Sequence, residues 1–205
     1  MDKTTLFLSI FKQAKKKYGK STKRLAGESW SQDWQTLLAT IYSAQSRDEL
    51  TIPVMESAFS KLPTLESWAK APLSKIESLT KKINYYKTKS KNSKATAQLL
   101  IKNFQAEVPD TIESLVSLPG VGRKTANLIL TEIHNKSGIC VDTHVHRLSN
   151  VLGLVKTKTP YETELALQKI APKSYWSEIN RIFVLWGKEV PGRDKKRLIA
   201  NIIKT

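Results

Sequence analysis

A single run of residues predicts how this chain folds: Leu118-Pro119-Gly120-Val121-Gly122-Arg123-Lys124-Thr125-Ala126. Pro119 limits continuation of a preceding helix, and the two glycines allow backbone angles and close approaches that other residues do not. The run therefore predicts a helix, a tight hairpin and a second helix. Amides at the start of that second helix would favour an anion such as phosphate, because the helix dipole is positive there. The glycines alone would equally fit an ordinary helix–helix turn.

Lys124 falls in the first turn of the second predicted helix, next to Arg123. A helix N-terminus and a neighbouring positive charge both disfavour the ammonium form of a lysine. A neutral amine is a nucleophile that can attack a sugar C1′ atom and form a Schiff base. Because the chain has 34 basic residues, Lys124 could instead be one more contact to a phosphate.

Asp142 follows Lys124 by eighteen positions, within Val141-Asp142-Thr143-His144. An aspartate ahead of a helical stripe is a good N-cap. A capping carboxylate also has a fixed direction, so it could stabilise positive charge developing on a deoxyribose ring or relay protons. Both roles are compatible. Cys140 is expected to be a small buried residue, and the role of His144 stays open.

The charge of the chain predicts a polyanionic partner. Its 205 residues include 34 Lys and Arg against 18 Asp and Glu, which gives a net charge of +16 and a pI near 9.9. Nucleic acid is the usual partner of such a protein, while solubility alone or an anionic membrane surface are the alternatives. A hydrophobic content of 40% is ample for a core, so the charge does not indicate disorder.

Several classes of protein are excluded by what the sequence lacks. Cys140 is the one cysteine, so it forms no internal disulfide, and no Cys/His cluster has the spacing of zinc ligands. No apolar run approaches the roughly 18 residues of a membrane span, and the N-terminus does not have the composition of a signal peptide. We expect a monomeric intracellular protein of the cytoplasm or nucleoid, with no membrane partner.

Helical periodicity dominates the chain, and Leu6, Phe7, Ile10, Phe11 and Ala14 form its first apolar stripe. No segment shows convincing alternation of apolar and polar residues. The sequence therefore predicts an all-α protein of about ten helices. One of them is expected to start at Asp110, which resembles a capping residue.

Residues 81–94 contain six lysines that flank Tyr85 and Tyr86. Positive charge interleaved with aromatic rings suits a surface that follows a nucleic-acid backbone and stacks on bases. On that interpretation Lys87 and Lys89 bind DNA. A solvated lysine-rich loop with one tyrosine in the core explains the segment equally well.

Three motifs together resemble the helix-hairpin-helix DNA glycosylases, and among them the endonuclease III-like enzymes. They are Ser43-Ala44-Gln45 with Asp48, the run 118–126, and the run 141–144, in the order and spacing of that family. The resemblance covers nearly the whole chain. It implies two helical lobes with DNA bound in the cleft between them.

The resemblance also implies the extent of each lobe. A six-helix barrel-type lobe with the hairpin would span residues 31–139, and the second lobe would combine residues 1–30 with residues 140–205. DNA phosphate would be held at the hairpin, and we count Leu118, Gly120, Val121, Gly122 and Arg123 among the DNA-binding residues. Family members often bind a monovalent cation there, which the backbone at Leu118 and Val121 would hold.

Four further residues take their roles from the resemblance. Lys124 would be the nucleophile that forms the Schiff base, and Asp142 its carboxylate partner. Gln45 would fill the gap left by an extruded nucleotide, and Tyr85 falls where the family has an apolar wedge. The local sequence around Tyr85 diverges from the family pattern.

One departure from the family concerns its cofactor. Most endonuclease III relatives end in four cysteines that hold an iron–sulfur cluster, whereas this chain continues from residues 187–192 into a basic tail, Arg193 to Lys204, without cysteine. We therefore expect no cluster and no other cofactor. The tail is expected to be helical and either to contact DNA by charge or to form a solvated face.

The resemblance implies a bifunctional DNA glycosylase and AP lyase of base excision repair. It would remove damaged bases, most of all oxidised pyrimidines, from double-stranded DNA and cleave the abasic strand by β-elimination. A monofunctional mismatch glycosylase and a non-enzymatic helix-hairpin-helix DNA-binding module are the two alternatives. The lysine argues against the first, and Asp142 and Gln45 argue against the second.

Overall fold

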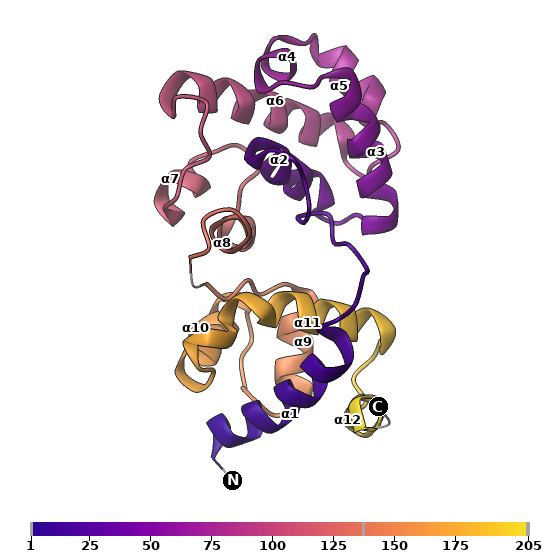
Figure 1. Ribbon diagram of the computed structural model, residues 1–205, viewed down its shortest axis with the longest axis vertical. Coiled ribbons are helices and arrows are strands. Elements are labelled where there is room, and N and C mark those ends of the chain that lie inside the picture. Colours follow the sequence, from indigo (N-terminus) through magenta and orange to yellow (C-terminus); the bar gives the residue numbers. More distant parts are fainter. Residues whose placement is uncertain (1, 137, 204–205) are drawn as a thin grey trace. The chain divides into compact units, whose positions relative to one another are not determined.

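The computed structural model describes residues 2–136 and 138–203 and confirms the all-α class (Figure 1). Its described residues form twelve α-helices and one short 3-10 helix, with no strand among them. No described helix is both long enough and apolar enough to cross a bilayer. Lys204, at the end of the tail considered above, lies outside the described residues.

The chain divides into two compact units, and each is described by itself. The central unit is Arg24–His134, and the terminal unit joins Met1–Lys23 to Asn135–Thr205. The lobe boundaries inferred from the resemblance, 30/31 and 139/140, fall a few residues after these divisions.

The helices of the central unit are α2 (Asp33–Ser43), α3 (Asp48–Lys61), α4 (Leu65–Lys70), α5 (Leu73–Thr80), α6 (Tyr86–Asn103), α7 (Ile112–Val116) and α8 (Arg123–Glu132). The terminal unit contains α1 (Lys3–Tyr18), α9 (Thr143–Val151), α10 (Pro160–Ile170), the 3-10 helix η1 (Lys173–Tyr175), α11 (Trp176–Glu189) and α12 (Lys195–Ile203).

The central unit is built around α2, which is buried along nearly its whole length. Helices α3, α6 and α8 all contact α2, and α6 also packs on α4 and α5. Large rings fill this core, and Tyr42 and Trp68 are fully buried in it. Because the Gln45 segment follows α2 and the hairpin precedes α8, both segments are attached to the core of this unit.

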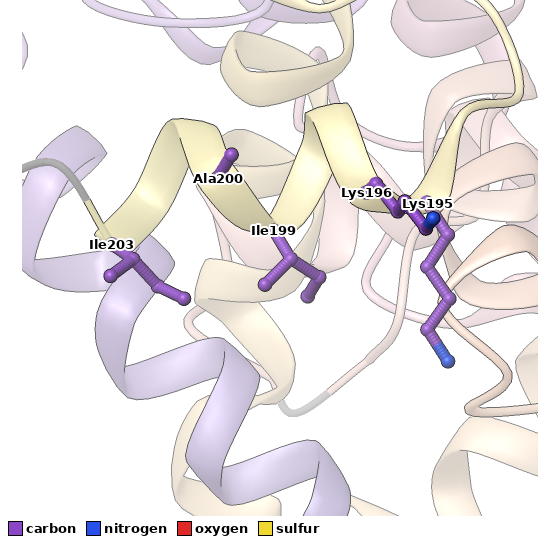
Figure 2. Close-up of a pocket in the computed structure, with 5 residues that line it drawn as sticks. All are labelled: Lys195, Lys196, Ile199, Ala200 and Ile203. Carbon is purple, nitrogen blue, oxygen red and sulfur yellow. The ribbon is translucent and has the colours of Figure 1, made fainter.

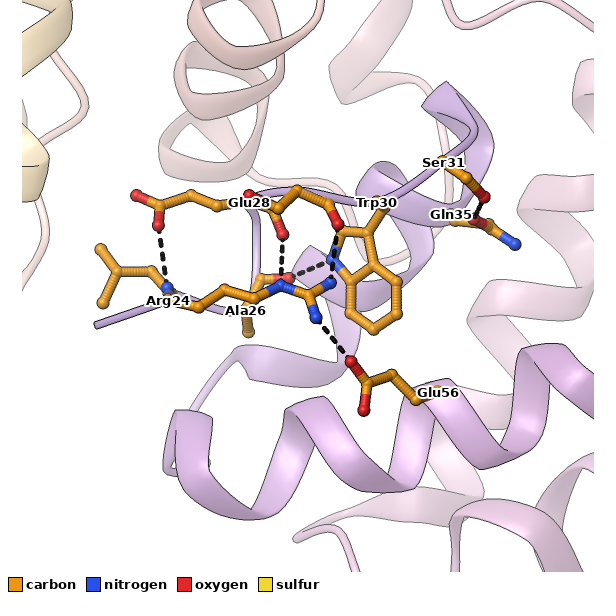
Figure 3. A network of polar contacts seen from close by, with 9 residues as sticks. Arg24, Ala26, Glu28, Trp30, Ser31, Gln35 and Glu56 are labelled. Carbon is orange, nitrogen blue, oxygen red and sulfur yellow. Dashed lines mark hydrogen bonds and ion pairs between the residues drawn. The ribbon is translucent and has the colours of Figure 1, made fainter. Parts of the chain in front are cut away.

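A polar network fastens the start of the central unit to α3 (Figure 3). The Arg24 guanidinium lies 2.6 Å from the Glu56 carboxylate, donates to the Glu28 carbonyl at 2.8 Å, and covers the Trp30 ring at 4.2 Å from its centroid. The Trp30 indole N–H in turn donates to the Ala26 carbonyl at 2.7 Å. These contacts order a segment that has no helix of its own.

Helix α6 is longer than the sequence suggested, because it includes most of the lysine-rich segment. Its buried residues in that part are polar, namely Lys89, Ser90 and Ser93, rather than an apolar stripe. Ser90 and Ser93 lie 3.0 and 3.1 Å from the Tyr42 hydroxyl, and Ser90 also lies 3.0 Å from the Thr80 hydroxyl. Most of the segment is therefore helical, and part of it is buried.

Helix α7 starts one residue later than predicted. Thr111 is its N-cap, with extended backbone angles and a hydroxyl that accepts from the Ser114 amide at 3.2 Å. The expectation that Asp110 caps this helix is therefore wrong, because the next residue has both the conformation and the hydroxyl that the cap needs.

The terminal unit packs α1, α9 and η1 against α11, and α10 contacts α1 and α9. The tail is helical, as expected, and α12 packs on α1, where the Tyr18 hydroxyl donates to the Asn201 side chain at 2.7 Å. Burial raises the pKa of Tyr18, so it keeps this proton. The opposite face of α12 lines a shallow, mostly apolar pocket (Figure 2). That pocket is formed by Lys195, Lys196, Ile199, Ala200 and Ile203.

Candidate active site

The hairpin turns at Gly120. The Val121 amide donates to the Leu118 carbonyl at 3.1 Å, and Gly120 has a φ of +82°, which L side chains rarely adopt. A Cβ at this position would lie 3.1 Å from Asn92 and 3.2 Å from Ile41. The backbone angle therefore favours glycine at residue 120, and a side chain there would also press on both neighbours.

At Gly122, by contrast, neither the backbone angles nor the neighbouring described atoms require a glycine. It is the N-cap of α8, with a φ of −92° and a ψ of 174° that any residue can adopt. A Cβ built on it meets no described atom within 4 Å. The backbone at the start of α8 is thus open to the approach of an external group, at the end of the helix that favours an anion.

The side chains around this helix start divide by burial. Leu118 and Val121 are 2% and 6% exposed and belong to the core, so they can reach DNA only through their main chain. Arg123 and Lys124 are exposed at the first two positions of α8, and Thr125 and Ala126 are buried behind them. Lys124 is therefore not sealed in the core.

Asp142 is the N-cap of α9 in the terminal unit. Its Oδ1 atom accepts from the His144 amide at 2.9 Å and from the Val145 amide at 2.8 Å. Neither bond involves Oδ2, which takes no hydrogen bond within residues 2–136 and 138–203. One oxygen thus fixes the direction of a half-buried carboxylate whose second oxygen can act on another group.

The residues that flank Asp142 have packing roles. Cys140 is buried, as expected, and its carbonyl accepts from the Asn180 side chain at 3.0 Å. His144 packs against α11, since a Cβ at Gly187 would come within 2.6 Å of its Nδ1 atom. The described residues contain no group of three or more His, Cys, Asp or Glu side chains able to hold a metal ion.

Gln45 and Tyr85 each lie in an exposed turn of the central unit, and their backbone angles are similar. Their φ angles are +53° and +57°, left-handed values that cost a residue with a side chain about 1 kcal/mol. Tyr85 is 67% exposed, and Gln45 is exposed as well. The Asn84 side chain donates to the Gln45 carbonyl at 3.0 Å, so the two turns are directly connected.

The expectation that Lys89 binds DNA is corrected by its burial. Its side chain is 7% exposed, and its ammonium group donates to the carbonyls of Tyr42, at 2.9 Å, and Ala44, and to the Ser46 hydroxyl at 3.2 Å. Burial lowers the pKa of Lys89 to about 8, while these acceptors favour the charged form. A lysine enclosed in this way cannot present its charge to a phosphate.

The other polar residues of α6 differ in their exposure and in the groups that they contact. Lys87 is exposed, as a DNA contact requires. Lys94 donates to the Ala71 carbonyl at the end of α4, at 2.6 Å. Thr96 donates to the Pro119 carbonyl at 2.8 Å, and Asn92 lies against Gly120. Helix α6 thus contacts both the hairpin and the Gln45 turn. The sequence pattern does not reveal this role, because the partners are distant in the chain.

Comparison with known proteins places this site in a family. Residues 38–173 match the family described as "HhH-GPD superfamily base excision DNA repair protein". Endonuclease III of Thermotoga maritima is 40% identical over 157 residues, which cover 77% of this chain and 74% of that protein. Endonuclease III of Bacillus subtilis is 34% identical over 159 residues, with 77% and 73% covered.

Solved structures agree with the sequence matches. A trapped covalent intermediate of endonuclease III with DNA, in an estranged-adenine complex, has a TM-score of 0.84 at 29% identity and covers 92% of this chain and 87% of its own. A thermostable thymine-DNA glycosylase, at 19% identity and a TM-score of 0.78, shares the fold.

The chain therefore belongs to the HhH-GPD superfamily of base excision DNA repair proteins. Within that superfamily it is an endonuclease III homologue, with the DNA glycosylase and AP lyase functions of base excision repair. The hairpin and the aspartate eighteen residues beyond Lys124 were the features of the sequence that predicted this membership.

Proposed function

We propose that the protein excises oxidised pyrimidines from double-stranded DNA and cleaves the resulting abasic strand, with Lys124 as the nucleophile. The single observation that carries the proposal is the position of Lys124, an exposed residue in the first turn of α8, directly after the open backbone at Gly122. A phosphate held at the hairpin would bring a sugar to the Lys124 amine. A solved relative supports it, because endonuclease III has been trapped in a covalent intermediate with DNA.

The chemistry needs no group beyond the side chains proposed here and water. The Lys124 nitrogen attacks C1′, and the bond from C1′ to the base breaks with its electron pair leaving on the base, which takes up a proton. The amine loses a proton and the sugar ring opens to give an imine. Loss of a C2′ proton then expels the 3′ phosphate by β-elimination, and water hydrolyses the imine to restore the amine.

Asp142 is proposed as the carboxylate partner of this reaction. It would stabilise the positive charge that develops on the sugar as the base departs, and accept protons from the amine. This role is supported by the difference between the two oxygens of Asp142. Oδ1 accepts both capping hydrogen bonds, and Oδ2 accepts none from the described residues. The cap would hold the carboxylate in one direction throughout the reaction.

The DNA itself would be held by the central unit. We propose that the main chain from Leu118 to Gly122 binds a phosphate, with a monovalent cation at the carbonyls of Leu118 and Val121, and that Arg123 and Lys87 add charge. The target nucleotide would leave the stack for a pocket. Gln45 and Tyr85 would fill the space that it leaves, and their exposure on connected turns supports this role.

The residues present do not fit the iron–sulfur cluster of most relatives. Four thiolates bind such a cluster, whereas the chain has one cysteine, which is buried. The end of α11 is closed by the Arg147 guanidinium, which donates to the carbonyls of Gly187, Val190 and Gly192. We propose that the protein acts without a cluster, and that it acts where the genome lies, in the cytoplasm or nucleoid.

A panel of duplexes, each with one defined lesion, tests the substrate class. Strand cleavage is measured for oxidised pyrimidines, oxidised purines, mismatches and a plain abasic site. The proposal predicts cleavage of the oxidised pyrimidines and of the abasic site. Release of a mismatched base without any strand cleavage would contradict it and would indicate a monofunctional enzyme.

A further inference from the structure

We propose that Lys89, together with Asn84, is a positioning residue that locks the Gln45 turn to the Tyr85 turn, so that the two side chains enter the DNA stack as one unit. The inference rests on the roles proposed above for Gln45 and Tyr85. It assigns to Lys89 no contact with DNA, and it makes a distinct claim about how the pair is held.

Lys89 binds both turns at once. Its main-chain amide donates to the Tyr85 carbonyl at 3.0 Å, and its ammonium group donates to the carbonyls of Tyr42 and Ala44 and to the Ser46 hydroxyl. Two of these acceptors belong to Ala44 and Ser46, the residues immediately before and after Gln45. A single residue thus joins the segment that carries Gln45 to the residue that forms the second turn.

The ammonium group suits the end of α2. A helix leaves its last carbonyls without partners within the helix, and its dipole favours a cation there. Tyr42 lies in the last turn of α2, and Ala44 is its C-cap. All three donors of the ammonium group are used, so the geometry of the turn is fixed from several directions.

Burying a lysine without a counter-ion costs free energy, which argues that Lys89 has a function at this position. The side chain is 7% exposed, and no carboxylate pairs with it among the described residues. An apolar side chain at this site would avoid the cost of removing a charge from water. It could not, however, hold two carbonyls and a hydroxyl around a turn.

The backbone of both turns needs such support. Gln45 and Tyr85 have left-handed φ angles of +53° and +57°, which residues with side chains keep only when their surroundings enforce them. Asn84 adds a second connection by donating to the Gln45 carbonyl at 3.0 Å. Without the side-chain bonds of Lys89 and Asn84 we expect the Gln45 turn to relax and the two side chains to lose their fixed separation.

The test compares Lys89→Met and Asn84→Ala with a matched control, Lys94→Met. Lys94 also donates to a helix-end carbonyl from α6, but that carbonyl belongs to Ala71. Single-turnover excision is measured on a lesion in a duplex and on the same lesion in a single strand, where no gap in a stack needs to be filled. We expect the duplex rate to fall on the order of tenfold for Lys89→Met, less for Asn84→Ala, and not for the control.

The single-stranded rate separates positioning from general damage to the fold. Positioning predicts that the single-stranded rate stays near that of the unmodified protein in both variants. Equal losses on both substrates, or equal losses in Lys89→Met and Lys94→Met, would overturn the inference. Asn84 is exposed, so Asn84→Ala keeps the test decisive even when Lys89→Met folds poorly.

A double-mutant cycle with Gln45→Ala completes the test. When Lys89 acts through Gln45, Lys89→Met causes little further loss of duplex activity in the Gln45→Ala background. Full additivity of the two losses would refute the coupling. Unchanged duplex excision by Gln45→Ala alone is a different failure, because it removes the proposed role of Gln45 and the inference with it.

Discussion

The side-chain amide of Asn84 donates a hydrogen bond of 3.0 Å to the main-chain carbonyl of Gln45. This bond joins two exposed turns, of which the second presents Tyr85 with 67% of its surface accessible. Both turns belong to the central unit, so their connection is a property of one folded body. The two turns thus form one connected element of the central unit.

The buried Lys89 amine predicts a pH-dependent contribution to stability. Burial lowers its pKa from 10.5 to about 8. Between these pH values the unfolded chain therefore binds more protons than the folded chain. As the pH rises through this range, the Lys89 contribution increases the free energy of unfolding. Relative to Lys89→Met, we expect that free energy to increase by roughly 2 kcal/mol from about pH 7.5 to about pH 10. Denaturant titrations of both proteins across this range measure it. A difference that stays constant with pH would show that the Lys89 pKa is the same in both states.

Substitution of Asp142 separates its structural role from its chemical role. Asp142→Asn keeps an oxygen for the α9 cap and removes the charge, so we expect a stability change under about 0.5 kcal/mol and a loss of excision on the order of 10²-fold. Asp142→Ala loses the cap as well and should cost about 1 kcal/mol of stability. Thermal unfolding and single-turnover excision measure the two effects. An Asp142→Asn protein that excises at the full rate would leave Asp142 as a cap only.

We expect Gly120→Ala to lower stability and Gly122→Ala to weaken DNA binding instead. Gly120→Ala forces a side chain into a left-handed backbone and against Asn92 and Ile41, so we expect a loss of about 1–3 kcal/mol in stability. Gly122→Ala meets open space and should change stability by less than about 1 kcal/mol. Its methyl group would instead obstruct the proposed phosphate. Weaker binding of an abasic duplex by Gly122→Ala, with stability retained, is the expected result, and unchanged binding would argue against a phosphate at this position.

The sequence predicted the features that depend on local chemistry. Pro119 and the glycines indicated the hairpin, and Asp142 ahead of an apolar stripe indicated the α9 cap; both are present. The all-α class followed from apolar residues at helical spacing. These predictions succeed because each depends on residues that are close together in the chain.

Features that depend on distant contacts were not predictable in the same way. The first half of α6 was ambiguous because its buried face presents Ser90 and Ser93, whose partner Tyr42 lies 48 and 51 positions away in the sequence. Lys89 was assigned to DNA because it belongs to the run of lysines around Tyr85 and Tyr86, and a lysine is usually exposed. Only the folded structure shows the end of α2 around its ammonium group.

The most direct test of the account is borohydride trapping on a lesion-bearing duplex. Lys124→Ala is compared with Arg123→Ala, which removes the adjacent exposed cation. We predict a covalent protein–DNA adduct for the unmodified protein and, at saturating DNA, for Arg123→Ala, and none for Lys124→Ala although it still binds the duplex. An adduct that persists in Lys124→Ala would contradict the assignment of the nucleophile.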